Sequence, residues 1–279
     1  MEKGDFCMIK EETLKKYSIL IAIAISFVLL LIGSLFSWDD NPVMGLDKAC
    51  ADIAIVLICF FFIKKFDLWD NSGFKKAGFA KGMLYGIPFI VIGICSAVIS
   101  NMSTDWSSLQ LISFGNTVLF SINMLLVGMN EEIWMRSLIL NLFLKKYGRT
   151  KKGVWTSIIL SAVVFGVIHI PNIAFMNPIT LIVQVINAAS AGVLFAAIFI
   201  CSKNIWAGMV THAAVDWLAL FIANCYTGGS SVLSISMSIP QAAVMILLGS
   251  LPPIVIAVFY LKRYFCLSIK NNQLYQVRS

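Results

Sequence analysis

The chain has 279 residues, of which 59% are hydrophobic and only 13% are charged. A soluble domain carries about twice that charged fraction, so the composition excludes an ordinary soluble protein and indicates a polytopic membrane protein. The formal net charge of +7 would suit a nucleic-acid-binding protein, but the distribution of the basic residues gives it another explanation, and we expect no nucleic-acid partner.

Eight apolar stretches are long enough to cross a bilayer, which takes roughly 20 helical residues. In chain order they are 18–37, 46–63, 82–100, 109–140, 153–170, 179–201, 205–225 and 241–261. The fourth is too long for one simple crossing, so we expect it to continue as a helix past the inner surface or to tilt strongly. The sequence therefore predicts an all-α integral membrane protein with about eight transmembrane helices.

The lysines and arginines predict how these helices are oriented. Nineteen of the 21 basic residues fall in the two tails and in alternate loops. The remaining loops, which contain none, are 38–45, 101–108, 171–178 and 226–240. The two exceptions are Lys48, near an outer end, and Arg136, inside the fourth stretch. By the positive-inside rule we expect both termini in the cytoplasm and the plasma membrane as the location, with some attraction to anionic lipid.

Three of the predicted helices carry polar or aromatic groups four residues apart, which places each pair on one helix face. The segments are Glu131-Glu132-Ile-Trp-Met-Arg136, Phe165-Gly-Val-Ile-His169 and His212-Ala-Ala-Val-Asp216. His169 and His212 are the only histidines in the chain. Ionisable side chains are costly in hydrocarbon and occur there mainly where they pair or function. Their concentration in three segments is typical of a reaction centre.

The fourth stretch contains both a possible ion pair and a possible base. Glu132 and Arg136 can form a buried pair that holds the bundle. Glu131 is rotated about 100° around the helix from Glu132 and is available as a base. The same helix carries asparagines at heptad spacing, which are Asn116, Asn123 and Asn130. This polar stripe indicates a helix that faces a wet or protein-lined interior instead of lipid.

Both histidine segments allow a structural and a functional interpretation. Phe165 can orient the imidazole of His169, or His169 can be a hydrogen-bonded core residue. Asp216 can fix the tautomer of His212, take part with it in binding a metal ion, or form a purely structural hydrogen bond. Asp52 is the other carboxylate inside a predicted span, near its outer end.

Together the three segments resemble the CPBP family of CAAX prenyl proteases and bacteriocin-processing, Abi-type intramembrane endopeptidases. The family patterns EExxxR, FxxxH and HxxxN or HxxxD occur here in the same order on successive helices. The resemblance implies a four-helix catalytic core at residues 109–225. Residues 1–108 would then form a tail and three transmembrane helices, and residues 226–279 the last transmembrane helix and a cytoplasmic tail.

The resemblance also implies hydrolysis of a peptide bond in a membrane-associated or lipidated peptide or protein. Glu131 would activate the water with help from His169, while His212 and Asp216 would stabilise the oxyanion or complete the site. Amide hydrolysis needs an activated water, an electrophilic stabiliser and a proton donor for the leaving amine. The supporting residues would be Glu132, Arg136 and Phe165.

Asp216 leaves the mechanism open, because many relatives carry Asn at this position. An ionised carboxylate repels an oxyanion, so Asp216 would have to be protonated, act through His212 or face a cation. With His169, His212 and Glu131 it would also complete a ligand set for zinc or another divalent metal. No HExxH pattern is present, so the sequence alone does not settle the choice, and of the two mechanisms we favour the one that needs no metal.

Two other functions compete with the protease. The first is a non-enzymatic bacteriocin-immunity or accessory protein on the same scaffold, which would not need the intact set of acids and histidines. The second is a proton-relay transporter, which would show broken helices or inverted repeats that are not evident here. The sequence specifies neither the substrate, prenylated or not, nor the oligomeric state.

Overall fold

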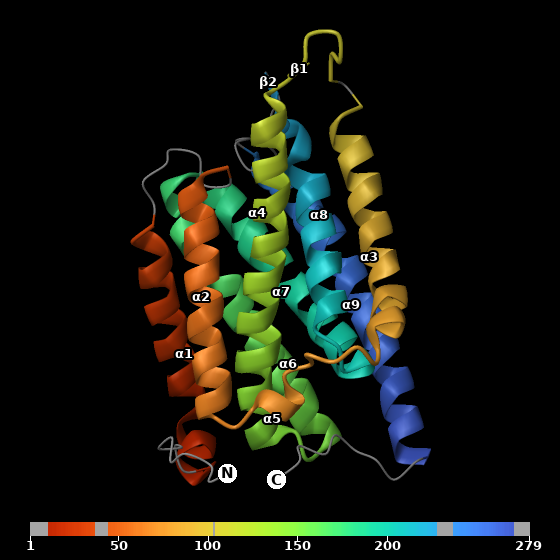
Figure 1. Cartoon of the computed structure of the whole chain (residues 1–279). Helices are drawn as coiled ribbons and strands as arrows, with labels where there is room; N and C mark the ends of the chain where they lie inside the picture. The colour runs from red at the N-terminus through yellow and green to blue at the C-terminus, as the bar shows by residue number, and fades with distance from the viewer. Residues whose placement is uncertain (1–10, 37–43, 103, 228–236, 271–279) are drawn as a thin grey trace.

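The computed structural model describes residues 11–36, 44–102, 104–227 and 237–270. Within them the chain is an all-α bundle of long helices that run up and down beside one another (Figure 1). The helices that correspond to the predicted stretches are α1 (Glu11–Ser34), α2 (Leu46–Lys65), α3 (Phe79–Ser100), α4 (Phe114–Glu132), α6 (Lys151–Val167), α7 (Pro178–Ser202), α8 (Trp206–Cys225) and α9 (Ile239–Lys270). The prediction of an all-α fold is therefore confirmed.

Six helices among the described residues are long and apolar enough to cross a membrane. They are Glu11–Ser34, Phe79–Ser100, Lys151–Ala174, Pro178–Ser202, Trp206–Cys225 and Ile239–Leu267. The other two candidates, α2 and the run that begins with α4, carry several charged residues each. The molecule is thus a multi-pass membrane protein, while the count of eight crossings and the orientation of the termini stay predictions.

The fourth predicted stretch forms one long helical run that changes its winding. After α4 come a π-helical segment, η2 (Ile133–Leu140), and the short helix α5 (Asn141–Tyr147), so the helix does continue beyond residue 140. It begins at Phe114 and not at 109, because β1 (Gln110–Leu111) precedes it and pairs antiparallel with β2 (Tyr226–Thr227). Sequence periodicity predicted neither the short strand pair nor the π segment.

Side-chain caps explain several helix starts. The Ser113 hydroxyl accepts a hydrogen bond from the Asn116 amide at 3.2 Å at the start of α4. Thr150 caps α6 in the same way, and the Asn177 side chain accepts from the Thr180 amide at 3.0 Å at the start of α7. Capping satisfies amides that have no partner inside the helix, so these residues fix where the core helices begin.

Small residues allow the core helices to approach closely. A Cβ atom on Gly86 would lie 2.1 Å from the Thr211 hydroxyl oxygen, between α3 and α8. One on Gly192 would lie 3.1 Å from the Phe165 ring, between α7 and α6. The close approach of α4 to α8 depends on Gly128 in the same way.

Two apolar clusters lie on either side of the polar segments. The larger one includes most residues of η2, much of α5 and the C-terminal part of α7. Residues of α1, α2, α6 and α9 also belong to it. The smaller one lies between α4 and α8 near the strand pair, and its buried members are Phe120, Met124 and Cys225. Along both α4 and α8 the polar residues fall between these clusters, so they lie inside the bundle and not at its ends.

Candidate active site

Glu132 and Arg136 form the buried ion pair that their spacing predicted. Arg136 Nη2 lies 3.2 Å from Glu132 Oε1, and neither side chain is exposed. The guanidinium carbon lies 4.8 Å from the ring centroid of Phe165 and 5.3 Å from that of Phe195, so the charge also faces two aromatic rings. Gly208 on α8 leaves room for Glu132, because a Cβ there would lie 3.0 Å from Glu132 Oε2.

The same carboxylate also holds His212, which the sequence did not suggest. His212 Nδ1 lies 3.1 Å from Glu132 Oε1, and since a carboxylate only accepts, Nδ1–H is the donor. The imidazole stacks on Phe195 with 4.6 Å between ring centroids. Glu132 therefore links the arginine of its own helix to a histidine 80 residues further along the chain.

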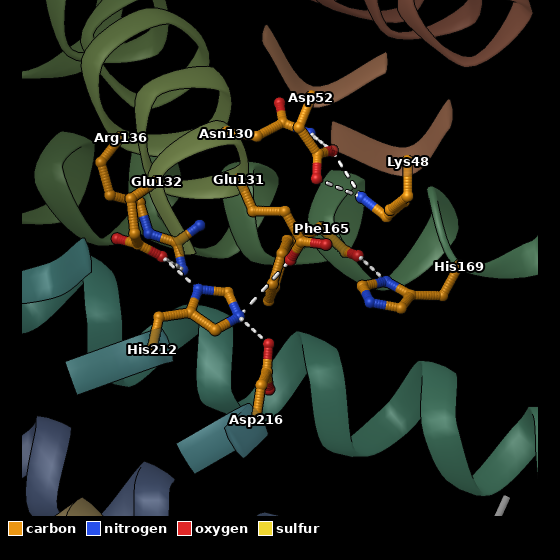
Figure 2. A network of polar contacts seen from close by, with 10 residues as sticks. All are labelled: Lys48, Asp52, Asn130, Glu131, Glu132, Arg136, Phe165, His169, His212 and Asp216. Carbon is orange, nitrogen blue, oxygen red and sulfur yellow. Dashed lines mark hydrogen bonds and ion pairs between the residues drawn. The ribbon is translucent and has the colours of Figure 1, made fainter. Parts of the chain in front are cut away.

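The other nitrogen of His212 faces two further carboxylates (Figure 2). Nε2 lies 3.5 Å from Glu131 Oε2 and 3.4 Å from Asp216 Oδ2. The Glu131 and Asp216 side chains are 20% and 30% exposed, whereas that of His212 is 7% exposed. One side of the imidazole is thus sealed by Glu132 and the aromatic rings, while the Nε2 side is reachable.

His169 lies beside this group, at the end of α6 and not within it. It occupies the turn before the 3-10 helix η3 (Ile170–Ala174). Its Nδ1 donates to the Phe165 carbonyl at 2.8 Å, and the two rings meet edge to face at 5.2 Å. Phe165 therefore orients the His169 imidazole through its backbone and its ring. The imidazole in contact with Glu131 is that of His212 (Figure 2).

The side chains named for a possible metal site are not arranged as a ready ligand set. Among the residues that the structure describes, no group of three or more His, Cys, Asp or Glu side chains is placed to hold a metal ion. His169 Nδ1 and His212 Nδ1 donate to oxygen atoms, which leaves Nε2 as the nitrogen of each ring that could face an ion. Because the described residues form no such group, we derive no step through a metal.

A second polar group adjoins Glu131. The sequence indicated its members separately and did not predict that they contact one another. The buried carboxylate of Asp52 binds the Lys48 ammonium at 2.5 Å and accepts a hydrogen bond from Asn130 Nδ2 at 2.8 Å. Lys48, the outer-side exception among the basic residues, is thus the partner of Asp52. The spacing of four residues between them was the available signal. Two of the three asparagines on α4 contact α2 or its cap, because Asn123 Nδ2 also donates to the carbonyl of Gly45, the N-cap of α2, at 3.1 Å.

Comparison with known proteins identifies the segment that contains all of these motifs. Residues 113–218 match the family model described as type II CAAX prenyl endopeptidase Rce1-like. The matched segment begins at the cap of α4 and ends two residues after Asp216. No curated protein and no solved structure matches the chain. The family match agrees with the resemblance to CPBP proteins that the three sequence patterns carry.

Proposed function

We propose that this chain, whose residues 113–218 form an Rce1-like domain, is an intramembrane endopeptidase of the CAAX protease type. One observation supports the proposal above the others. The reachable nitrogen of His212 faces Glu131 and Asp216 within 3.5 Å, while buried Glu132 holds the opposite nitrogen. An oriented imidazole between accessible carboxylates is suited to proton transfer and to stabilising negative charge.

In the proposed mechanism Glu131 is the general base. It takes a proton from a water molecule whose oxygen attacks the carbonyl carbon of the scissile peptide bond. Its side chain is 20% exposed, and the paired charge of Glu132 with Arg136 leaves Glu131 as the acid not bound to the arginine. The reaction needs no metal or cofactor, since the carboxylate activates the water directly.

His212 stabilises the oxyanion that forms in this attack. A hydrogen on each ring nitrogen satisfies the carboxylates on both sides and gives Nε2–H a positive charge to direct at the oxyanion. Asp216 acts through His212, by favouring this charged ring from 3.4 Å, and not as an oxyanion donor. In this role the Asp216 carboxylate faces the positive ring of His212, so its repulsion of the oxyanion is offset.

The leaving amine takes its proton when the tetrahedral intermediate breaks the C–N bond. Glu131, protonated in the first step, supplies this proton. We assign His169 a supporting role: its Nδ1–H is held by the Phe165 carbonyl, so Nε2 is the nitrogen of this ring available for proton transfer. The products are a carboxylic acid and a free amine, and Glu131 returns to its ionised state.

The substrate is a peptide segment within or anchored to the membrane. The active groups lie inside an apolar bundle, between two apolar clusters, where a soluble protein chain would not enter. A lipidated or transmembrane peptide reaches such a site through the bilayer. The family match concerns a prenyl endopeptidase, so we carry this function forward and not bacteriocin immunity.

The direct test is cleavage of a library of lipidated and transmembrane peptides by purified protein. We expect the wild type to cut a subset, detected by mass spectrometry of new termini, and His212→Ala to cut at most about a hundredth as fast. Equal cleavage by both proteins would show that the site is elsewhere. The same assay with a chelator addresses the metal: we expect full activity, whereas inhibition reversed by added zinc would contradict the proposed mechanism.

A further inference from the structure

The group formed by Lys48, Asp52 and Asn130 lies outside the residues that the proposed mechanism uses. Asp52 is 1% exposed, and Lys48 is 28% exposed and bound to it. Asn130 is buried and immediately precedes Glu131 on α4. Its amide donates to Asp52 across the interface between α2 and α4 (Figure 2). An acidic side chain of one helix is therefore fastened to the residue next to the proposed base.

We propose that Asp52, with Lys48 as its counter-ion, is a positioning residue that fixes Glu131 through Asn130. This inference rests on the proposed function. A buried carboxylate needs compensation, and Lys48 supplies the charge while Asn130 supplies a directional hydrogen bond. That bond restricts how α4 can turn or slide at residue 130. The Glu131 carboxylate is thereby kept within reach of His212 Nε2.

The place of the Asp52–Asn130 contact along α4 favours a positioning role over a role in general helix packing. Directly after Glu132 the chain enters the π-helical segment, where the winding differs from that of α4. A contact made close to this change fixes the position of α4 there, and π segments occur frequently at functional sites. The contact from Asp52 to Asn130 is made two residues before the winding changes.

A second asparagine offers a matched control on the same stripe. Asn123 also donates to α2, to the Gly45 carbonyl at 3.1 Å. It lies eight residues from Glu131, about 12 Å along the helix. Replacing either asparagine by alanine removes one amide that joins the same two helices. Only Asn130→Ala removes the bond beside the base.

The test measures kcat and KM on a peptide that the wild type cleaves. We expect Asn130→Ala to lower kcat about 10- to 100-fold with KM unchanged, because misplacement of about 1 Å costs roughly that much. Asn123→Ala should stay within about threefold of the wild type. An equal loss of kcat in both variants, or no loss in Asn130→Ala, overturns the proposal.

A second pair of variants separates positioning from folding. Lys48→Met/Asp52→Leu and Lys48→Met/Asp52→Asn both remove both charges and keep a side chain at position 52 that branches at Cγ. Only the second keeps an oxygen that accepts from Asn130, so we expect it to recover most of the kcat that the first loses. Equal kcat in both double variants overturns the proposal. Glu131→Gln runs in parallel: if it cleaves at the wild-type rate, the proposed function fails, whichever way the other variants behave.

Discussion

At the scale of single residues, the two adjacent glutamates have opposite environments. Glu131 is 20% exposed and faces His212 Nε2, whereas Glu132 is fully buried against Arg136 and His212 Nδ1. A rotation of about 100° between neighbouring helical residues produces this division. One carboxylate can therefore exchange protons with water while the other holds the charges around it in place.

This division predicts different consequences for the same substitution at the two positions. Glu132→Gln leaves Arg136 buried without its charge partner, which costs about 3–5 kcal/mol of unfolding free energy. Glu131→Gln changes a partly exposed group and should leave stability nearly unchanged. Thermal unfolding of both variants in the same detergent measures the difference. Equal melting temperatures would contradict the assigned environments.

Asp216 offers a test of its action through His212. Asp216→Asn removes the charge that favours the protonated ring but keeps an oxygen that can accept from Nε2–H, so we expect a loss of cleavage that stays within about tenfold. Asp216→Ala removes the acceptor and should lose about another tenfold. Initial cleavage rates at fixed peptide concentration distinguish them. A larger loss in the asparagine variant than in the alanine variant would show that the oxygen of residue 216 does not act by accepting.

The residue pairs four apart were predictable, because helix geometry alone places them on one face. The contacts between helices were not. Glu132 meets His212 across 80 residues, and Asp52 meets Asn130 across 78. No local pattern specifies which helix packs on which. The sequence therefore assigned Glu132 to Arg136 alone and treated Asp52 as a separate group.

At the scale of helices, the distance between α4 and α8 determines whether the site can form. Gly128 lies one turn before Glu131 on α4 and packs against the backbone of α8. A Cβ atom there would lie 2.7 Å from the Met209 carbonyl oxygen and 2.9 Å from the Ala213 nitrogen. Backbone atoms cannot turn aside as a flexible side chain can. The glycine thus permits the spacing at which Glu131 and His212 meet.

Gly128→Ala should therefore separate α4 from α8 and lower the cleavage rate about 10- to 100-fold. Gly115→Ala is the matched control on the same helix, because a Cβ there meets nothing within 4 Å. Its activity should equal that of the wild type. Cleavage rates of the two variants, compared at equal amounts of folded protein, provide the measurement. Similar rates in both would contradict the close packing of α4 on α8.

The π-helical segment shows a limit of prediction at this scale. Hydrophobic spacing distinguishes a helix from a strand but does not reveal a change in winding. Here Asn141 Nδ2 donates to the Asn71 carbonyl at 2.9 Å and lies 3.2 Å from each of the carbonyls of Arg136 and Ser137. These contacts come from the side chain of a single polar residue, which no periodicity could identify.

At the scale of the whole molecule, the helices that carry polar groups turn those groups toward one another. α2 and α4 pack their charged and amide groups against each other, while α1, α3 and α9 expose many large apolar side chains. Average hydropathy identifies α1, α3 and α9 as membrane spans but does not identify α2 and α4. For this reason the fold class was predictable from composition, while the number of crossings needs a direct measurement.

Reporter fusions test the predicted arrangement in the membrane. We expect fusions after Lys76 and after Arg149 to report the cytoplasm and a fusion after Asp105 to report the opposite side. The basic residues flank the first two positions, and the loop 101–108 has none. A fusion at the C-terminus should report the cytoplasm. The same side for residues 105 and 149 would contradict eight crossings with both termini inside.

The central claim is that Glu131 activates the water that cleaves a peptide bond. Glu131→Gln tests it most directly, because the change replaces one carboxylate oxygen by an amide nitrogen and preserves the shape of the side chain. On a membrane peptide cut by the wild type, we predict a kcat at least about 100-fold lower with the protein still folded. Cleavage by the folded variant at the wild-type rate would contradict the account.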